Sequence, residues 1–212
     1  MGSKPRGGTR WKRFAVVMVP SVAAAAAVGI GLAQGALAAS FTVSGQQFKV
    51  RAGHLEGDGF AQYGGLVDGY TSIAGDKTTK RPVAISSFNT ATINNLCQSL
   101  KTDIPLFGTV YMRIDAGSDK NKPVEAKQLY LDIAQLDGDA EFTNMDIGVA
   151  VKDQSKGPAV KDKGVLPGGF AQQADKAVLD NAEQVAWSTT AGTFKLSNLK
   201  LRLGTDSKME CF

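Results

Sequence analysis

The segment Phe194–Leu203, FKLSNLKLRL, contains the pattern that decides the fold of this chain. Apolar residues alternate with polar ones in both halves of the segment, but the parity of the alternation changes across Ser197 and Asn198. Strand side chains point alternately to two faces, so a slip of one residue would turn the second apolar set to solvent. A β-bulge or a sharp bend absorbs the extra residue, and Asn tolerates the left-handed backbone often needed there. The segment therefore predicts a strand, a bend and a second strand.

The same pattern recurs: an apolar residue, any residue, then Asn, Gln or His, then an apolar residue. The other breaks lie at Gly53-His54, Asn94-Asn95, Lys127-Gln128, Thr143-Asn144 and Asp180-Asn181. The copies that begin at Ala126 and Phe142 are 16 residues apart, and those at Leu179 and Leu196 are 17 apart. This spacing indicates paired units stacked on one another.

The fold class that we predict is all-β: a single β-sandwich or a short solenoid-like stack of bent strands, preceded by one N-terminal hydrophobic helix. A chance resemblance among ordinary alternating strands would leave the all-β prediction unchanged. The glycine-rich stretch from Gly57 to Asp76 and the polar stretch from Lys152 to Gly169 are predicted to be loops. Residues Gly169 to Lys176 could form one short helix.

The N-terminal region carries the positive charge of the chain. Five Lys and Arg residues and no acidic residue precede Phe14, and residues Phe14 to Ala39 are uncharged. Of the 24 Lys and Arg residues, 19 remain from residue 14 onward against 20 Asp and Glu, so the body is close to neutral. This balance argues against a nucleic-acid partner. Basic residues before an apolar segment favour an N-terminus in the cytoplasm and a body exported across the membrane.

The chain divides into three parts on this interpretation. Residues 1–13 form a basic cytoplasmic region, residues 14–39 a signal peptide or transmembrane anchor, and residues 40–212 an exported all-β domain. Ala36, Ala38 and Ala39 supply the small residues of a signal-peptidase site. However, the apolar run that precedes that site is roughly 20 residues long, which is enough to span a bilayer. We therefore expect a domain that is secreted or held at the outer face of the cell membrane.

Cys97 and Cys211 are the only two cysteines. An even number of cysteines in an exported protein is most simply one disulfide, and the alternative is two unpaired thiols. The bond would fasten the end of the chain to its middle. The chain-entropy model assigns roughly 4 to 5 kcal/mol to a loop of that length.

The sequence offers little catalytic chemistry. His54 is the only histidine, and it occupies a position in the strand repeat where Asn or Gln stands elsewhere. No nucleophile elbow, C-x-x-C, H-E-x-x-H or phosphate-binding glycine loop is present. Asp137, Asp139 and Glu141 would share one face of an extended strand and are weak candidates for calcium ligands. A solvated strand face is the favoured explanation, because the spacing does not match that of an EF-hand loop. We predict no catalytic residue and no cofactor.

Three stretches resemble a known family: RWKRFAVVMVPSVAAAAAVGIGLAQGALAASFTVSGQQFKV (10–50), NLCQS (95–99) and AWSTTAGTFKLSNLKL (186–201). The chain resembles an actinobacterial family of exported or membrane-anchored proteins of unknown function. Members are sometimes labelled cholesterol esterase. The resemblance implies a Gram-positive cell-surface setting, and it supplies no catalytic residues.

These observations favour a non-enzymatic cell-envelope domain that binds a partner protein, lipid or wall component. We expect the protein to contact the membrane through its N-terminal segment and to have a membrane protein or lipid as a further partner. Two alternatives are a lipid or sterol ester hydrolase of unrecognised design and a lipid-binding protein without catalysis.

Overall fold

A computed structural model describes residues 43–160 and 164–212. The predictions for the basic region, the hydrophobic helix and the cleavage site fall outside these residues. The described elements are β1 (Phe48–Tyr70), β2 (Thr78–Asn94), β3 (Leu96–Ile104), β4 (Gly108–Ala116), β5 (Val124–Thr143), β6 (Asp146–Ala150), η1 (Val151–Asp153), β7 (Phe170–Thr190), β8 (Thr193–Lys195), β9 (Lys200–Gly204) and η2 (Ser207–Met209). The all-β prediction is confirmed. In the described part of the chain, no helix has the length and apolar character needed to cross a membrane.

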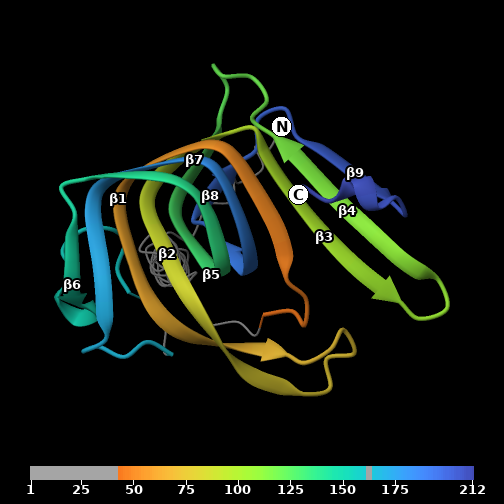
Figure 1. Cartoon of the computed structure of the whole chain (residues 1–212), viewed down its shortest axis with the longest axis horizontal. Coiled ribbons are helices and arrows are strands. Elements are labelled where there is room, and N and C mark those ends of the chain that lie inside the picture. The colour runs from red at the N-terminus through yellow and green to blue at the C-terminus, as the bar shows by residue number, and fades with distance from the viewer. Residues whose placement is uncertain (1–42, 161–163) are drawn as a thin grey trace, which may run out of the picture. The chain divides into compact units, whose positions relative to one another are not determined.

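All nine strands belong to a single sheet, so the β-sandwich alternative is wrong. Four long strands close this sheet on itself. β1 pairs with β2 on one edge and with β7 on the other, and β5 likewise pairs with both β2 and β7. We call these four strands the ring, and Figure 1 shows them as tall arches lying side by side.

The ring strands bend where the repeats lie. Five non-glycine residues at the predicted breaks have left-handed backbone angles: Asn95, Gln128, Asn144, Asn181 and Asn198, with φ between 50° and 55°. Only the copy at Gly53-His54 lacks such a residue among the positive-φ residues of the described chain. The prediction of a left-handed bend is therefore confirmed at five of its six positions.

The bends of neighbouring strands line up across the sheet, and we call each line a crease. The first crease passes in order through Asn198, Gly117, Asn95, Gly53, Asn181 and Gly138. The second crease passes through Gly192, Gln128, Asn89, Gly59, Asp175 and Asn144. Because every strand carries its extra residue at the same line, most registers continue unchanged across a crease. The aligned extra residues therefore bend neighbouring strands together, whereas a β-bulge would add a residue to one strand alone.

The creases absorb the slip in alternation as the sequence predicts. Ala126 and Leu129 are three residues apart on either side of the second crease, yet both are buried in the core. Gly59 shows why a glycine is required at such a line. Its φ is 62°, and a Cβ atom there would lie 2.1 Å from Nδ2 of Asn89. The glycines between Gly57 and Tyr70 thus belong to β1, and the predicted loop over that stretch is wrong.

The spacing of the repeats equals one circuit of the ring. Gln128 and Asn144 lie 16 residues apart on the second crease, and Asn181 and Asn198 lie 17 apart on the first. A closed sheet has a fixed stagger in its hydrogen-bond register, so a line followed around it returns to the same strand at a displaced residue. Gln128 of β5 and Asn144, which directly follows β5, thus lie one circuit apart on the second crease. The interpretation of stacked units stays a prediction.

The core lies inside the ring, and a second cluster lies against its outer face. Apolar residues of β1, β2, β5 and β7 fill the interior, with Phe88, Val124 and Leu129 almost fully buried. The outer cluster includes Tyr63 and Ile85, and Val160 and Val165 of the long connection after η1 pack against it. That connection is largely irregular, as predicted. The predicted helix over Gly169 to Lys176 is wrong, because β7 begins at Phe170.

Candidate functional site

Three strands extend away from the ring, and we call them the wing: β3, β4 and β9. β3 continues the line of β2 beyond Asn95 and pairs with β1 only along Lys49–Arg51. It then pairs with β4, which pairs with β9 at the end of the sheet order. In Figure 1 the wing stands to the right of the arches. Since side chains alternate along each strand, the wing has two different faces.

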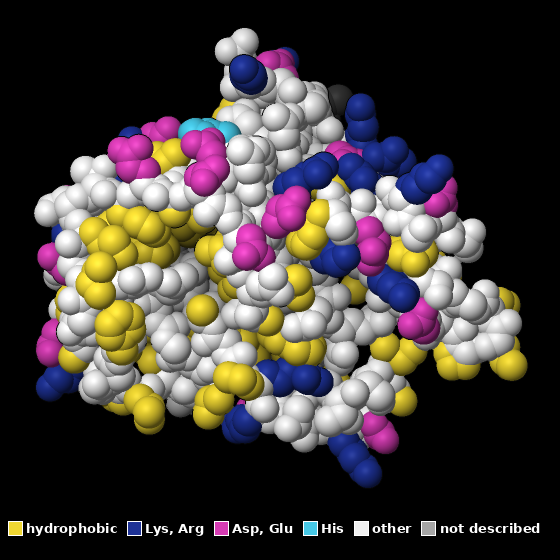
Figure 2. All heavy atoms as spheres, in the orientation of Figure 1, with side chains coloured by type: hydrophobic (Ala, Val, Ile, Leu, Met, Phe, Trp, Pro, Cys, Tyr) yellow, Lys and Arg dark blue, Asp and Glu magenta, His cyan; other side chains and the backbone are white. Residues whose placement is uncertain are grey.

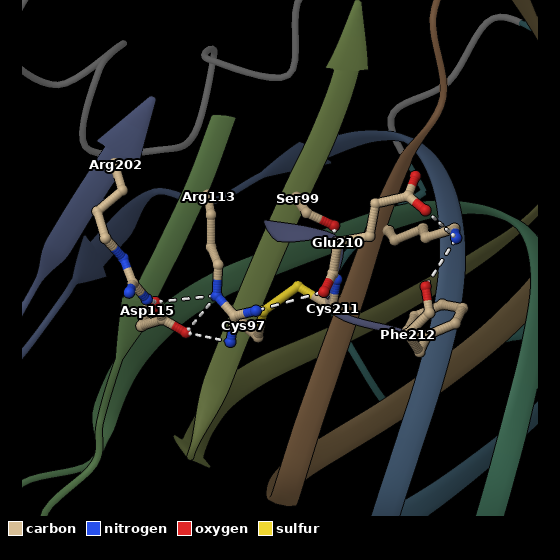
Figure 3. Close-up of a disulfide and its surroundings, with 9 residues drawn as sticks. Cys97, Ser99, Arg113, Asp115, Arg202, Glu210, Cys211 and Phe212 are labelled. Atoms are coloured by element: carbon tan, nitrogen blue, oxygen red, sulfur yellow. Dashed lines mark hydrogen bonds and ion pairs between the residues drawn. A yellow bond between two sulfur atoms is a disulfide. The ribbon is translucent and has the colours of Figure 1, made fainter. Parts of the chain in front are cut away.

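The first face of the wing is covered by the end of the chain. Cys97 on β3 forms a disulfide with Cys211, as the sequence predicts. The backbone N–H of Cys211 donates to Oγ of Ser99 at 3.0 Å. Lys49 of β1 donates to Oε2 of Glu210 at 3.2 Å and to the carbonyl of Phe212 at 2.7 Å. Figure 3 shows these groups gathered around the disulfide. The last residues are thus tied to the wing and to the ring.

The partly buried carboxylate of Asp115 lies at the centre of the charged groups on this face. Asp115 of β4 accepts hydrogen bonds from Arg113 of the same strand, at 2.9 to 3.1 Å, and from Arg202 of β9. Burial raises the pKa of Asp115 as the largest single effect, but the hydrogen bonds and charges of the two arginines together lower it below 3.8. Arg113 also donates to the carbonyl of Glu210 at 3.3 Å. These contacts hold β4, β9 and the chain end together (Figure 3).

The second face of the wing is apolar, and its outermost strand β9 has exposed leucines on it. Neighbouring strands place apolar residues opposite one another on it, with Leu100 beside Met112 and Met112 beside Leu203. Leu201 lies beside Ile114 in the next row. The side chains of Leu201 and Leu203 are 56% and 67% exposed. Large exposed apolar patches of this kind mark interaction sites in soluble proteins.

The apolar face continues to the end of the wing, where β3 turns into β4. Leu106 and Phe107 occupy this turn, which we call the tip. They are 103% and 83% exposed, so their side chains contact almost nothing in the described chain. Leu106 has a left-handed backbone with a φ of 71°. The tip and the apolar face together form the candidate functional site.

The interior of the ring contains a second, smaller candidate. A cavity of about 100 Å³ is lined mainly by apolar side chains of the four ring strands. Gln62 and Gln184 add polar groups, and Gln62 donates to Oγ of Ser86 at 2.7 Å while accepting from Gln172. Figure 2 shows hydrophobic side chains gathered on the side of the molecule where β6 lies.

The weak calcium candidates lie on an exposed part of β5. The regular strand that would place Asp137, Asp139 and Glu141 on one face is interrupted at Gly138, where the first crease crosses and the register with β7 shifts. Among residues 43–160 and 164–212, no group of three or more His, Cys, Asp or Glu side chains is placed to hold a metal ion.

The only histidine lies beside the first crease on the outside of the ring. Nδ1 of His54 is 2.7 Å from Oδ1 of Asp180, and Nε2 is 4.0 Å from Oε2 of Glu56. Both ring nitrogens therefore face carboxylates, whereas a nucleophilic triad requires one of them to face a hydroxyl. A buried serine does contact a carboxylate elsewhere, since Ser188 donates to Oδ2 of Asp132 across β7 and β5.

The main features of the candidate site differ from what the sequence predicts. The alternation of β9 is typical of buried strands, yet Leu201 and Leu203 are exposed. The adjacent apolar pair Leu106-Phe107 was not among the predicted site residues. The available signal was the pair itself, followed by Gly108, in a stretch where a turn would normally be polar.

Comparison with known proteins places the chain in a family but assigns it no activity. Residues 44–212 match DUF6230, which is described as a family of unknown function. Neither a curated protein nor a solved structure matches the chain. The matched residues are well over half of the chain and contain every described strand. The chain therefore belongs to DUF6230, a family of unknown function.

Proposed function

We propose that this protein is a non-enzymatic module of the cell envelope that binds a partner through the apolar face of the wing. The N-terminal segment, residues 14–39, directs the β domain to the outer side of the membrane, where the domain is held or released. The single observation that supports this function is the exposed row of apolar residues on β9, represented by Leu201 and Leu203.

The two faces of the wing explain why this row favours binding. The covered face has the disulfide and the ion pairs of Asp115, so the wing is a firmly built element. A sheet with one covered face normally exposes polar residues on the other. On β9, Lys200 and Arg202 belong to the charged face, and Leu201 and Leu203 belong to the open apolar face. A partner that covers them would remove their apolar surface from water, which is favourable.

The alternatives have weaker support. Ligand sites for small molecules usually have volumes of roughly 300 to 1,000 Å³, and the cavity inside the ring is smaller than that at about 100 Å³. A hydrolase would need a hydroxyl nucleophile beside a base, and His54 instead faces Asp180 and Glu56. We therefore assign binding to the wing.

Photo-crosslinking in the producing cells would test the proposal. One variant carries a photoreactive amino acid in place of Leu201, and a matched control carries it in place of Lys200 on the opposite face of the same strand. We expect an adduct at position 201 and none at position 200. The mass of the adduct distinguishes a protein, a lipid and a wall glycan. An unmodified chain in both variants, or equal adducts in both, would overturn the assignment of binding to this face.

A further inference from the structure

We propose that the tip of the wing, Leu106 and Phe107, inserts into the outer surface of the lipid bilayer that residues 14–39 reach. This inference rests on the proposed function and names one occupant of the tip, a lipid bilayer. It begins from a feature that the fold does not need, because neither side chain is buried in the described domain.

The tip carries two structural costs. Leu106 is fully exposed, and its φ of 71° is a conformation that is uncommon for non-glycine residues other than Asn and Asp. Gly108, with a φ of 86°, already supplies a left-handed residue to the same turn. A polar residue at position 106 would make the turn more stable and more soluble. The apolar pair is therefore explained by a contact outside the described chain.

The start of the described chain lies beside the wing. Val43 is bonded to the end of β1, since its N–H donates to the carbonyl of Asp68 at 2.7 Å. Three residues later, Oε1 of Gln46 accepts from Oγ1 of Thr102 at 3.1 Å, near the end of β3. Residues 43–46 thus lead from the end of β1 to the part of β3 that is far from the ring, before the chain enters β1.

Few residues link residues 14–39 to the tip along the chain and across the hydrogen bond between Gln46 and Thr102. Seven residues separate Ala39 from Gln46, which can span at most about 25 Å when extended. Leu106 lies four residues beyond Thr102, at most about 13 Å along the chain. In Figure 1 the start of β1, the β1–β2 turn and the tip all lie along the lower side of the view. Both lengths are short enough for the proposed insertion of the tip into the bilayer that residues 14–39 reach.

The neighbouring groups suit a lipid surface. Ile73 in the β1–β2 turn is also an exposed large hydrophobic residue. Lys77 and Lys101 are exposed on the flanking segments and can approach anionic headgroups. The shape of the tip also favours lipid over protein, because a convex turn with two neighbouring apolar side chains enters a fluid surface more readily than it matches a flat protein face. Apolar residues in such positions enter roughly 5 to 10 Å into the headgroup and acyl boundary.

Quenching of tryptophan fluorescence by brominated lipids tests the insertion. The full chain, with Trp11→Phe to remove the tryptophan next to the apolar segment, is reconstituted in vesicles of phosphatidylglycerol and phosphatidylcholine with or without bromines on the acyl chains. Trp187 remains as a constant background, since it packs under Arg81 at 4.0 Å. Phe107→Trp reports on the tip. The control is Phe170→Trp, because Phe170 is also an exposed phenylalanine, at 62%, but begins β7 on the ring.

We expect the added emission of the Phe107→Trp variant to fall about twofold in brominated vesicles, as for a side chain at acyl-chain depth. The Phe170→Trp variant should show no change. Adding Leu106→Asn, which suits the left-handed backbone but removes the apolar contact, should reduce the quenching at position 107. Absence of quenching at position 107, or equal quenching at positions 107 and 170, would overturn the inference. The crosslink at position 201 reports on the apolar face independently, so the two proposals can fail separately.

Discussion

Asn181 shows how a single residue sets the path of a strand. Its φ of 51° places it in the left-handed region, where a residue with a Cβ atom normally pays a steric penalty. Asn reduces that penalty because its short amide can bond to nearby backbone groups. The neighbouring apolar residues, Leu179 and Ala182, both point into the core as a result. The same reasoning applies to the other four left-handed amide residues of the creases.

Substitution of Asn181 should separate backbone strain from packing. Asn181→Ala should lower the free energy of unfolding by about 1 to 2 kcal/mol, because alanine has no side-chain compensation in this conformation. Asn181→Gly should be nearly neutral, since glycine adopts positive φ freely but adds entropy to the unfolded chain. Urea denaturation of both variants measures the difference. Equal destabilisation by both substitutions would contradict a backbone origin.

Asp115 should make the stability of the wing depend on acidity. Its pKa is raised by burial but is held below 3.8 by the hydrogen bonds of Arg113 and Arg202. The folded-state pKa is therefore lower than the unfolded one, so the ionised carboxylate stabilises the fold above pH 3.8 and this contribution is lost as the pH falls further. Asp115→Asn should lower stability at neutral pH by about 1 kcal/mol.

Thermal melts from pH 7 downward would check this prediction. The difference in melting temperature between wild type and Asp115→Asn should be constant near neutrality and should shrink as the pH drops below 3.8. Asp206→Asn is a suitable control for the loss of an exposed carboxylate, since that residue only caps η2. A difference that grows toward low pH would contradict the assigned sign.

Single residues were the scale at which the sequence was most informative. A change of parity next to Asn or Gln predicted the bends, since few residue types tolerate that backbone. The pairing of Cys97 with Cys211 followed from their number alone and is confirmed. Gly57 and Gly59 were misread as loop residues, because the same glycine preference arises at a turn and at a bend within a long strand. Only the neighbouring Phe88 and Asn89, from another strand, distinguish the two.

At the scale of elements, the wing depends on its cross-link. Two of its strands, β4 and β9, pair with no ring strand, and the end of the chain covers one of their faces. The disulfide joins residues 114 positions apart, so it removes a large amount of chain entropy from the unfolded state. The sequence could not show that the leucines of β9 face outward, because alternation reveals that two faces differ and leaves open what covers each.

Removal of the disulfide should destabilise the protein strongly. The double variant Cys97→Ser with Cys211→Ser should lose about 2 to 5 kcal/mol of unfolding free energy. Reduction of the wild-type protein should give a similar loss, which serves as a control for effects of serine in a buried position. Guanidinium denaturation with and without reductant is the measurement. An unchanged midpoint in both experiments would show that the loop closure contributes nothing.

The whole molecule is determined by pairings that the sequence does not encode locally. The copies 16 and 17 residues apart were recognised, but which strand lies between them was not. In the structure, β2, β1 and β7 lie between the copies at Gln128 and Asn144, following the second crease around the ring. Such a stagger depends on how four strands close on one another, so it is a property of the sheet as a whole. The ring strands pair on both edges over much of their length, whereas β9 ends the sheet order.

Hydrogen exchange should distinguish the ring from the wing. Amides of β1 and β7 bond within the ring on both edges and should exchange only through global opening, whereas β9 ends the sheet order and should open locally. We expect amides of β9 to exchange about 10- to 100-fold faster than those of the ring strands. Reconstitution in vesicles should then slow exchange at residues 104–108 and leave the ring unchanged. Uniform exchange over ring and wing would contradict the local opening of β9, and lipid protection confined to the ring would contradict the insertion of the tip.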